Sequence, residues 1–251
     1  MGPKSPLFRN AELKERSKSM TAMSQERLNS ILSQFSRLKV AVIGDFFLDK
    51  YQIIDPSLDE PSIETGLTAR QVVEVRNVPG AAGTVTNNLV SLGVGQIDAI
   101  GFVGEDGEGH DLFNGLRSRG VNCDSMLVAR DRFTPTYTKP MIRVGSEETE
   151  LNRIDIKNRT PTSKEIESEL TDILWEHLHP SVEKSVVNAV IVLDQVSEAN
   201  CGVVTEHIRA VISDMAIKQP HVIFFVNGFT RIEDSHTFIF IYHVLKCFLK
   251  G

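Results

Sequence analysis

Two carboxylates that follow an apolar run are the residues of this chain best suited to bind a ligand. Residues 40–43 read Val-Ala-Val-Ile and lead into Gly44 and Asp45, and Asp49 follows four residues later. Because parallel sheets bind ligands beyond the carboxyl ends of their strands, we expect both carboxylates to face a ligand. Carboxylate oxygens accept hydrogen bonds from hydroxyl groups, so the predicted ligand is a polyol. The alternative is that Asp45 only ends the strand and Asp49 lies on the surface.

A block of small residues provides the second half of this predicted site. Residues 80–88 read Gly-Ala-Ala-Gly-Thr-Val-Thr-Asn-Asn and open a helical pattern. Small side chains let the backbone come close to a ligand, and the first N–H groups of a helix are free to donate to its oxygen atoms. A tight packing turn would use the same residues, and this alternative stays open.

The apolar pattern also predicts the elements that must position these residues. We expect strands at 38–43, 97–103, 186–193 and 221–226, and helices at 83–92, 108–119, 162–179 and 203–218. The third of these helices follows a capping box from Thr162 to Glu165. Strands that alternate with helices predict parallel βαβ units, and hence an α/β fold in which helices flank a mostly parallel sheet.

Outside this alternation, three segments have a different character. Residues 1–37 predict a disordered leader that ends in a short amphipathic helix, and the folded body is expected at 38–228. Segments near 51–76 and 134–143 alternate like half-exposed strands and predict a small antiparallel flap outside the main sheet. Residues 229–251 form an atypical tail, whose aromatic run has no clear period, and we interpret it as a non-native ending.

Composition narrows the functional classes. The chain has 251 residues, 41% of them hydrophobic, which is enough to bury a sizeable core. Its formal charge is −6, and no basic stripe interleaved with aromatic residues occurs, so no nucleic-acid partner is expected. The three cysteines lie far apart, at positions 123, 201 and 247, which favours a reducing compartment and no metal site. Without an apolar signal segment, we expect a cytoplasmic protein that does not enter a membrane.

In family terms, the segment from Val40 to Asp49 and the small-residue block together resemble the sugar site of ribokinase-like (PfkB family) carbohydrate kinases, over roughly residues 38–228. The resemblance implies that the Asp49 carboxylate accepts hydrogen bonds from sugar hydroxyls and that Asp45 supports the turn. The family's paired glycines fall on Gly80 and Ala81. Thr84 replaces an asparagine that usually contacts the sugar.

Further positions of the sequence resemble one particular branch of the family. Asn88 and the Arg-x-Asp sequence that starts at Arg153 match the D-glycero-β-D-manno-heptose 7-phosphate kinase branch. Arg143 or Arg153 could pair with a substrate phosphate, although solvated surface arginines are the alternative. Asp194 aligns with an acidic position that faces the same crevice. The implied substrate is a sugar or sugar phosphate, and a homodimer formed through the flap is the implied assembly.

The resemblance implies ATP and Mg²⁺ as cofactors, but one family segment is absent from the 251 residues. The family keeps its catalytic aspartate in a Gly-Ala-Gly-Asp segment, and no such segment follows Gly202. We therefore assign no catalytic residue, expect most of the nucleotide site to be missing, and expect the truncated chain alone to be inactive or nearly so. Two alternatives are a non-catalytic, sugar-binding or regulatory remnant of a kinase and a Rossmann-type dinucleotide enzyme, although no glycine fingerprint follows Ile43.

Overall fold

A computed structural model describes residues 23–179 and 186–228. The predicted tail and the predicted leader up to residue 22 lie outside the described residues. The chain divides after Phe35 into two compact units, and each is treated by itself. In the first unit, helix α2 (Gln25–Leu32) begins after Ser24, whose side chain accepts a hydrogen bond from the Arg27 N–H group, as an N-cap residue does.

The described residues of the second unit are built on a parallel sheet of five strands. Their order is β12-β11-β1-β6-β7, and every neighbouring pair is parallel. The bounds are β1 Lys39–Gly44, β6 Gln96–Gly104, β7 Met126–Ala129, β11 Ala189–Asp194 and β12 Ile223–Gly228. The α/β fold class and four of these strands were predicted from the sequence and are confirmed; β7 was not predicted.

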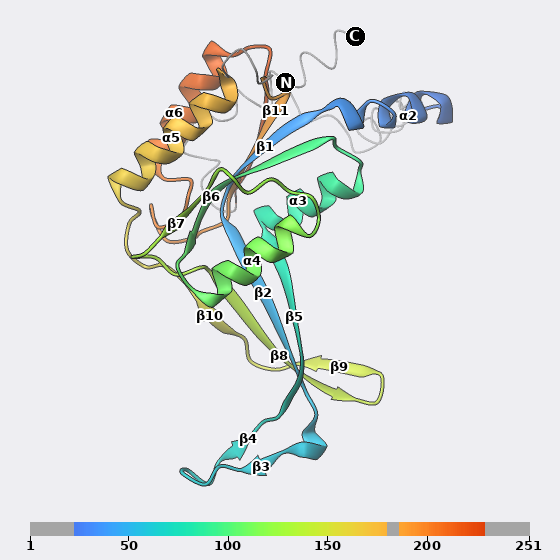
Figure 1. Cartoon of the computed structure of the whole chain (residues 1–251), viewed down its shortest axis with the longest axis vertical. Coiled ribbons are helices and arrows are strands. Elements are labelled where there is room, and N and C mark those ends of the chain that lie inside the picture. The colour runs from blue at the N-terminus through green and yellow to red at the C-terminus, as the bar shows by residue number, and fades with distance from the viewer. Residues whose placement is uncertain (1–22, 180–185, 229–251) are drawn as a thin grey trace, which may run out of the picture. The chain divides into compact units, whose positions relative to one another are not determined.

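Helices cover both faces of this sheet (Figure 1). On one face lie α3 (Ala82–Ser91) and α4 (Gly107–Arg117), and on the other lie α5 (Lys164–Leu178) and α6 (Glu206–Lys218). All four helices were predicted. The cap of α5 was placed one residue too early, because Ser163 rather than Thr162 accepts the hydrogen bond from the Ile166 N–H group.

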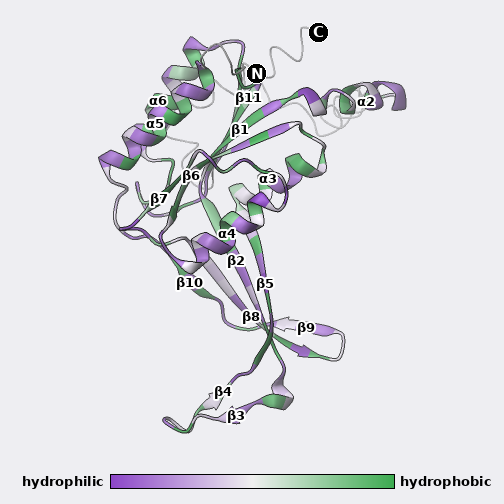
Figure 2. Ribbon diagram, in the orientation of Figure 1, coloured by the Kyte–Doolittle hydropathy of each residue, from purple (hydrophilic) through white to green (hydrophobic). Residues whose placement is uncertain are grey.

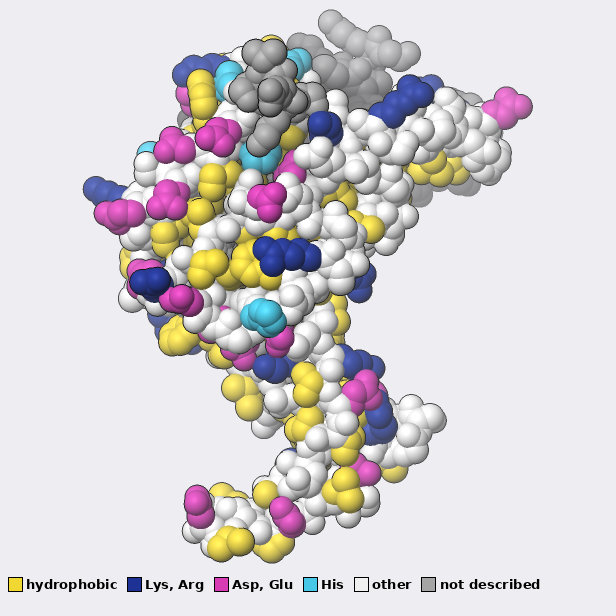
Figure 3. All heavy atoms as spheres, viewed as in Figure 1, with side chains coloured by type: hydrophobic (Ala, Val, Ile, Leu, Met, Phe, Trp, Pro, Cys, Tyr) yellow, Lys and Arg dark blue, Asp and Glu magenta, His cyan; other side chains and the backbone are white. Residues whose placement is uncertain are grey.

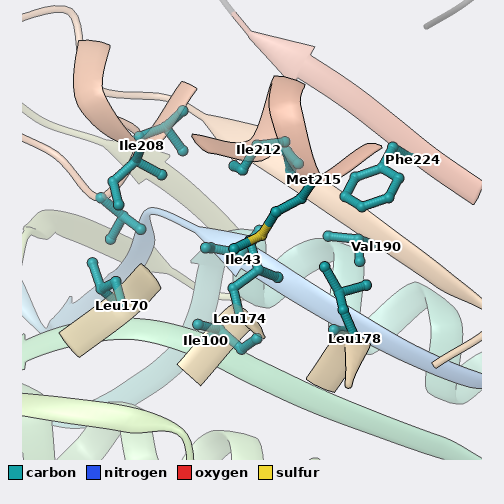
Figure 4. Packing of buried hydrophobic residues seen from close by; sticks show 14 of the residues in the cluster. Ile43, Ile100, Leu170, Leu174, Leu178, Val190, Ile208, Ile212, Met215 and Phe224 are labelled. Atoms are coloured by element: carbon teal, nitrogen blue, oxygen red, sulfur yellow. The ribbon is translucent and has the colours of Figure 1, made fainter. Parts of the chain in front are cut away.

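Two apolar cores hold these layers together. The core beneath α5 and α6 packs Leu170, Leu174, Ile208 and Met215 against Ile43 and Val190 of the sheet (Figure 4). The opposite core lies beneath α3 and α4 and contains Leu112 and Leu116. Hydropathy follows this arrangement, since the strands of the sheet are mostly apolar while the helices are polar on their outer sides (Figure 2).

A second sheet contains the predicted flap. Its strand order is β10-β8-β2-β5, with β9 paired to β8. The bounds are β2 Phe46–Ile54, β5 Val72–Ala81, β8 Thr136–Val144, β9 Glu147–Glu150 and β10 Ile154–Ile156. Its pairs are antiparallel except for β2 and β8, which are parallel. Between β2 and β5 the chain forms a short 3₁₀ helix η2 (Pro56–Leu58) and a hairpin of β3 (Glu60–Pro61) and β4 (Thr68–Ala69).

The strand alternation gives this sheet two different faces. One face packs on α4, where the Lys50 ammonium pairs with Glu108 at 3.1 Å and the Asn77 amide donates to Asp111 at 2.7 Å. Phe47, Asp49 and Tyr51 of β2 lie on the opposite face, because side chains along a strand alternate between its two sides. We call this second face the Asp49 face.

No helix within the described residues is long and apolar enough to cross a membrane.

Candidate functional site

Asp45 lies directly between the two sheets. β1 ends at Gly44 and β2 begins at Phe46, so Asp45 is the single residue that joins them. The side chain is buried and accepts three backbone N–H groups, from Gln195 (2.7 Å), Val196 (3.2 Å) and Val203 (2.7 Å). Burial raises the pKa of Asp45 to about 6, although the hydrogen bonds from Val203 and Gln195 oppose the rise.

Asp49 lies within a strand, where the sequence led us to expect it beyond the end of one. The chain re-enters extended structure at Phe46, because residues 46–54 are rich in aromatic and β-branched side chains, which favour strands. The half-buried Asp49 carboxylate forms an ion pair with the Lys139 ammonium at 2.8 Å. Lys139 also donates to the Tyr51 hydroxyl at 3.2 Å. Asp49 is therefore held on the face of the second sheet by Lys139 of the neighbouring strand β8.

Gly80 leaves room for the Asp49 carboxylate. β2 and β5 pair so that Phe47 lies opposite Gly80 and Asp49 lies opposite Val78. A Cβ atom at position 80 would stand 2.6 Å from Asp49 Oδ2, closer than real Cβ contacts come. Two residues that are 31 positions apart in the sequence, and that were both assigned to the site, thus lie against each other.

Tyr137 connects Asp49 with the Arg-x-Asp sequence. Tyr137 belongs to β8, where it lies opposite Asp49 of β2 on one side and opposite Asp155 of β10 on the other. Its ring contacts the Phe47 ring edge to face, with centroids 5.2 Å apart, and carries the Arg153 guanidinium 4.2 Å above its centroid. Arg153 forms two hydrogen bonds to Asp155, of 2.6 and 2.8 Å, so its charge is already paired.

A pocket opens beside this cluster, and its space free of protein atoms is about 430 Å³ when the adjoining open solvent is included. Phe47 and Tyr137 contribute aromatic rings from the second sheet, and Lys157, Glu198 and Asn158 contribute polar groups. Lys157 pairs with Glu198 at 3.5 Å. Aromatic walls with a few polar groups are typical of small-molecule sites, because apolar surface supplies affinity while polar groups fix orientation.

The remaining residues of the small-residue block lie at the start of α3. Ala81 precedes the helix with φ 51° and ψ −115°, a conformation that residues with a Cβ rarely adopt. Thr84 and Asn88 are exposed and one turn apart, so they share a face of the helix. The structure thus brings Asp49 and Gly80 into contact, while Thr84 and Asn88 occupy a neighbouring helix.

Asp194 ends β11 and belongs to the same edge of the main sheet. Its carboxylate pairs with Arg209 of α6 at 3.1 Å, and its negative charge contributes to the raised pKa of Asp45. It pairs in register with Gly228, the last described residue of β12. Arg143, the other arginine considered for a phosphate, pairs with Glu74 (2.7 Å) and Glu148 (2.8 Å), farther along β8.

Sequence reasoning missed several residues of this site. Tyr137 and Lys139 lie in the predicted flap, and the alternation of that strand could have placed them on one face. The segment 195–203 also lines the pocket, and its sequence carries no periodic signal that would have marked it.

The described residues do not by themselves fit ATP and Mg²⁺. Within 23–179 and 186–228, no three His, Cys, Asp or Glu side chains gather into a group that could hold a metal ion. Lys157 is the one cation among the described residues that line the pocket, and it is already paired with Glu198. A triphosphate needs several donors aimed at its oxygens, and a single lysine that is already paired does not supply them.

A comparison with protein-family models decides which kind of protein has this arrangement. The model described as "pfkB family carbohydrate kinase" matches residues 38–210. The chain belongs to the pfkB family of carbohydrate kinases. This confirms the resemblance inferred from the sequence, and the matched range contains every residue assigned to the site.

Among curated pfkB relatives, the Bifunctional protein HldE of Pelobacter propionicus is 31% identical over 150 residues, which are 60% of this chain and 29% of that protein. The protein of the same name from Helicobacter pylori is 26% identical over 183 residues, 70% of this chain and 37% of that protein. The chain thus spans well under half the length of these relatives.

Solved structures of pfkB-type kinases share the fold. Phosphofructokinase-2 from Escherichia coli, in complex with fructose-6-phosphate, superposes with a TM-score of 0.51 at 16% identity and covers 76% of this chain and 55% of that one. At this identity the likeness supports the ribokinase-like fold alone.

Proposed function

We propose that residues 38–228 form the sugar-binding part of an ATP-dependent carbohydrate kinase. The observation that carries this proposal is the contact between Asp49 and Gly80 on the Asp49 face of the second sheet. A carboxylate held against a glycine backbone offers strong acceptors to sugar hydroxyls while leaving space for the ring. Family membership supports a sugar as the acceptor of the phosphoryl group and ATP as its donor.

Within this proposal each assigned residue has a role. Asp49 accepts hydrogen bonds from the sugar, and the Gly80–Ala81 backbone lies close to the ring. Thr84 and Asn88 offer polar side chains from α3, and Asp194 offers a carboxylate from the end of β11. Arg153 would contact a phosphate, if the substrate carries one, through the donors that Asp155 leaves free.

Binding of unphosphorylated and phosphorylated sugars, measured by calorimetry, tests the proposal. In Asp49→Asn we expect the dissociation constant to rise about 10- to 100-fold, because a hydrogen bond to a charged acceptor contributes about 1.5–3 kcal/mol. Asp124→Asn is the matched control, since Asp124 is an exposed aspartate outside the site. Binding that is equally tight in both variants, or absent from the whole sugar panel, would refute the proposal.

Arg153→Ala distinguishes the two substrate classes. If the substrate is a sugar phosphate, its affinity falls in this variant while that of the unphosphorylated sugar does not change. The nearby charges favour neither class by themselves, because Lys139, Arg153 and Lys157 are each paired with a carboxylate.

The same sheet supports the homodimer that the family resemblance implies. Val73 and Val75 of β5 are each 50% exposed, and Ile63 of the hairpin is fully exposed. Figure 3 shows hydrophobic side chains beside charged groups of both signs over this part of the molecule. β5 is also an edge strand, with unpaired backbone groups that a second copy of the chain could bond.

A non-catalytic role in sugar binding is the second candidate function. It is supported by the contact between Asp49 and Gly80, which is a binding feature and needs no catalytic residue. The two candidates share the sugar site and differ only in turnover.

A further inference from the structure

The segment 195–203 joins β11 to α6 and forms one wall of the pocket. Of the fifteen residues in the described part of the chain that line the pocket, seven belong to this segment. Gln195, Ser197 and Glu198 supply polar groups, and Val196 and Val203 supply apolar surface. This wall has neither helix nor strand structure, and a hydrogen bond from the Cys201 N–H to the Glu198 carbonyl, at 3.2 Å, lies within it; the contacts that reach it from other parts of the chain therefore matter for its shape.

Asp45 fixes both ends of the segment at once. Asp45 Oδ2 accepts the N–H groups of Gln195 and Val196 at its start, and Oδ1 accepts the N–H group of Val203 at its end. Gly202 packs directly on this carboxylate, since a Cβ there would stand 2.5 Å from Oδ1. A single buried side chain therefore brings together backbone groups up to eight residues apart.

Arg132 holds the same segment from the other side. Its buried guanidinium donates to the Cys201 carbonyl at 2.6 Å and to the Thr160 carbonyl at 2.7 Å. Thr162 adds two more bonds, from its N–H to the Asn200 carbonyl (2.7 Å) and from its hydroxyl to the Gly202 carbonyl (2.8 Å). The middle of the segment is thus tied to the loop that follows β10.

The backbone of Asp45 connects this wall to the sugar-binding strands. Its N–H donates to the Leu193 carbonyl at 3.1 Å, and its carbonyl accepts the N–H of Ala82, the first residue of α3, at 2.9 Å. β2, which carries Asp49, starts at the next residue. One residue therefore touches the pocket wall, the helix of Thr84 and Asn88, and the strand of Asp49.

We propose that Asp45 is a positioning residue, which holds segment 195–203 in place as a wall of the sugar pocket without itself binding the sugar. Both of its oxygens accept backbone N–H groups, so it differs in role from Asp49, whose Oδ1 pairs with Lys139 and whose Oδ2 lies against Gly80. The inference rests on the proposed sugar site for its effect on affinity, while the contact between Asp45 and the segment stands independently.

The charged groups around Asp45 set how it titrates. Asp194 raises its pKa by repulsion and is itself paired with Arg209. Glu198 and Lys157 pair with each other across the pocket, and Arg132 contacts the carbonyl of Cys201. None of these groups forms a direct ion pair with Asp45 within the described residues, so protonation of Asp45 is felt first by the three N–H groups that it accepts.

Amide NMR of the whole chain tests the contact, and calorimetry tests its effect. In the wild-type protein we expect the amide protons of Gln195, Val196 and Val203 to titrate together with a midpoint near pH 6. In Asp45→Asn this titration disappears, the amides of 195–203 exchange at least tenfold faster, and sugar affinity falls about tenfold. Val192→Ala, a core change on β11, controls for general destabilisation and should leave the sugar affinity unchanged.

The outcomes separate the inference from the function beneath it. If the amides titrate but no sugar binds to the wild type, the proposed function fails while the contact between Asp45 and segment 195–203 holds. If Asp45→Asn folds and binds sugar with wild-type affinity, Asp45 does not position the wall. If Asp45→Asn does not fold, the titration of the wild-type protein still tests the contact. Amide chemical shifts of residues 195, 196 and 203 that do not change between pH 5 and 7 would overturn the proposal.

Discussion

Asp49 and Gly80 form a matched pair across two strands, with the carboxylate of one lying where a side chain of the other would begin. The Asp49 carboxylate also pairs with Lys139, so it cannot move away from Gly80 without breaking this ion pair. Glycine at position 80 thus provides space for the acidic group that the proposed function needs.

Gly80→Ala is expected to weaken sugar binding about tenfold while the protein stays folded. The new methyl group displaces Asp49 Oδ2, which is the end of a side chain and can move, but it moves away from its ligand-binding position. Calorimetric titration with the sugar measures the loss. Gly107→Ala is the control, because a Cβ there meets no atom within 4 Å. Unchanged affinity in Gly80→Ala would show that the carboxylate does not depend on this space.

Ala81→Gly is expected to stabilise the protein by about 1 kcal/mol. Residue 81 has φ 51° and ψ −115°, which glycine adopts readily and alanine does not, and the relief exceeds the added entropy of the unfolded chain. Chemical denaturation measures the change. Ala82→Gly, one residue later in ordinary helical conformation, should instead destabilise by about 1 kcal/mol. If Ala81→Gly and Ala82→Gly destabilise the protein equally, the backbone at Ala81 is not strained.

The free energy of unfolding should carry a pH-dependent contribution from Asp45. Its folded pKa of about 6 lies above the ordinary value of 3.8, so the folded state holds the proton more tightly than the unfolded state does. This contribution is fully present below about pH 4 and is lost as the pH rises through 6, a change of about 3 kcal/mol. The measurement is denaturation of wild type and Asp45→Asn from pH 4 to 8. Relative to the variant, the wild type should become less stable as pH rises, and a constant difference would rule this out.

Val73→Lys should convert a dimer to a monomer. The substitution places a charge in the middle of the exposed apolar row on β5, where a second copy would otherwise pack. Light scattering on a sizing column reports the mass, which is 27.9 kDa for one chain. Val128→Lys is the control, because Val128 is 54% exposed on β7 of the other sheet. A wild-type protein with the mass of a single chain would contradict the proposed dimer interface.

The 251-residue chain is expected to bind sugar without forming ADP. The loss of a catalytic base alone lowers a rate about 10²- to 10⁴-fold, and the sequence holds no Gly-Ala-Gly-Asp segment to supply that base. A coupled assay for ADP, with ATP, Mg²⁺ and the sugar panel, gives the answer. Sugar-dependent ADP formation by the purified chain would place a base elsewhere in it.

Most of the central fold was predictable, because its signals are local. Apolar runs such as 40–43 mark buried parallel strands, and the stripes through Leu170 and Ile208 mark the helices that cover them. β7 was missed because Met126–Ala129 is only four residues long, which is too short to show a period. The N-cap of α5 was misplaced by one residue, since Thr162 and Ser163 are both good caps and Thr162 bonds to Gly202 instead.

The site was harder to predict, because its geometry depends on pairing between distant strands. The sequence identified Asp49 and Gly80, but only the register of β2 against β5 shows that they touch. The sequence also predicted that Asp45 and Asp49 would face the same ligand. In the structure the Asp45 carboxylate is buried and bound to backbone N–H groups, while the Asp49 carboxylate lies over Gly80. Contacts such as that of Asp45 with Val203, 158 residues away, leave no local pattern.

The uninterrupted pairing of β2 and β5 around Asp49 has a consequence for how this chain can vary in length. One residue inserted between Phe46 and Asp49 would turn Asp49 toward α4 and away from Lys139, because successive side chains of a strand point to opposite faces. Insertions within residues 55–71 would enlarge only the hairpin beyond the ends of both strands. Changes of length are therefore tolerable between β2 and β5, at residues 55–71, and destroy the site at the start of β2, before Asp49.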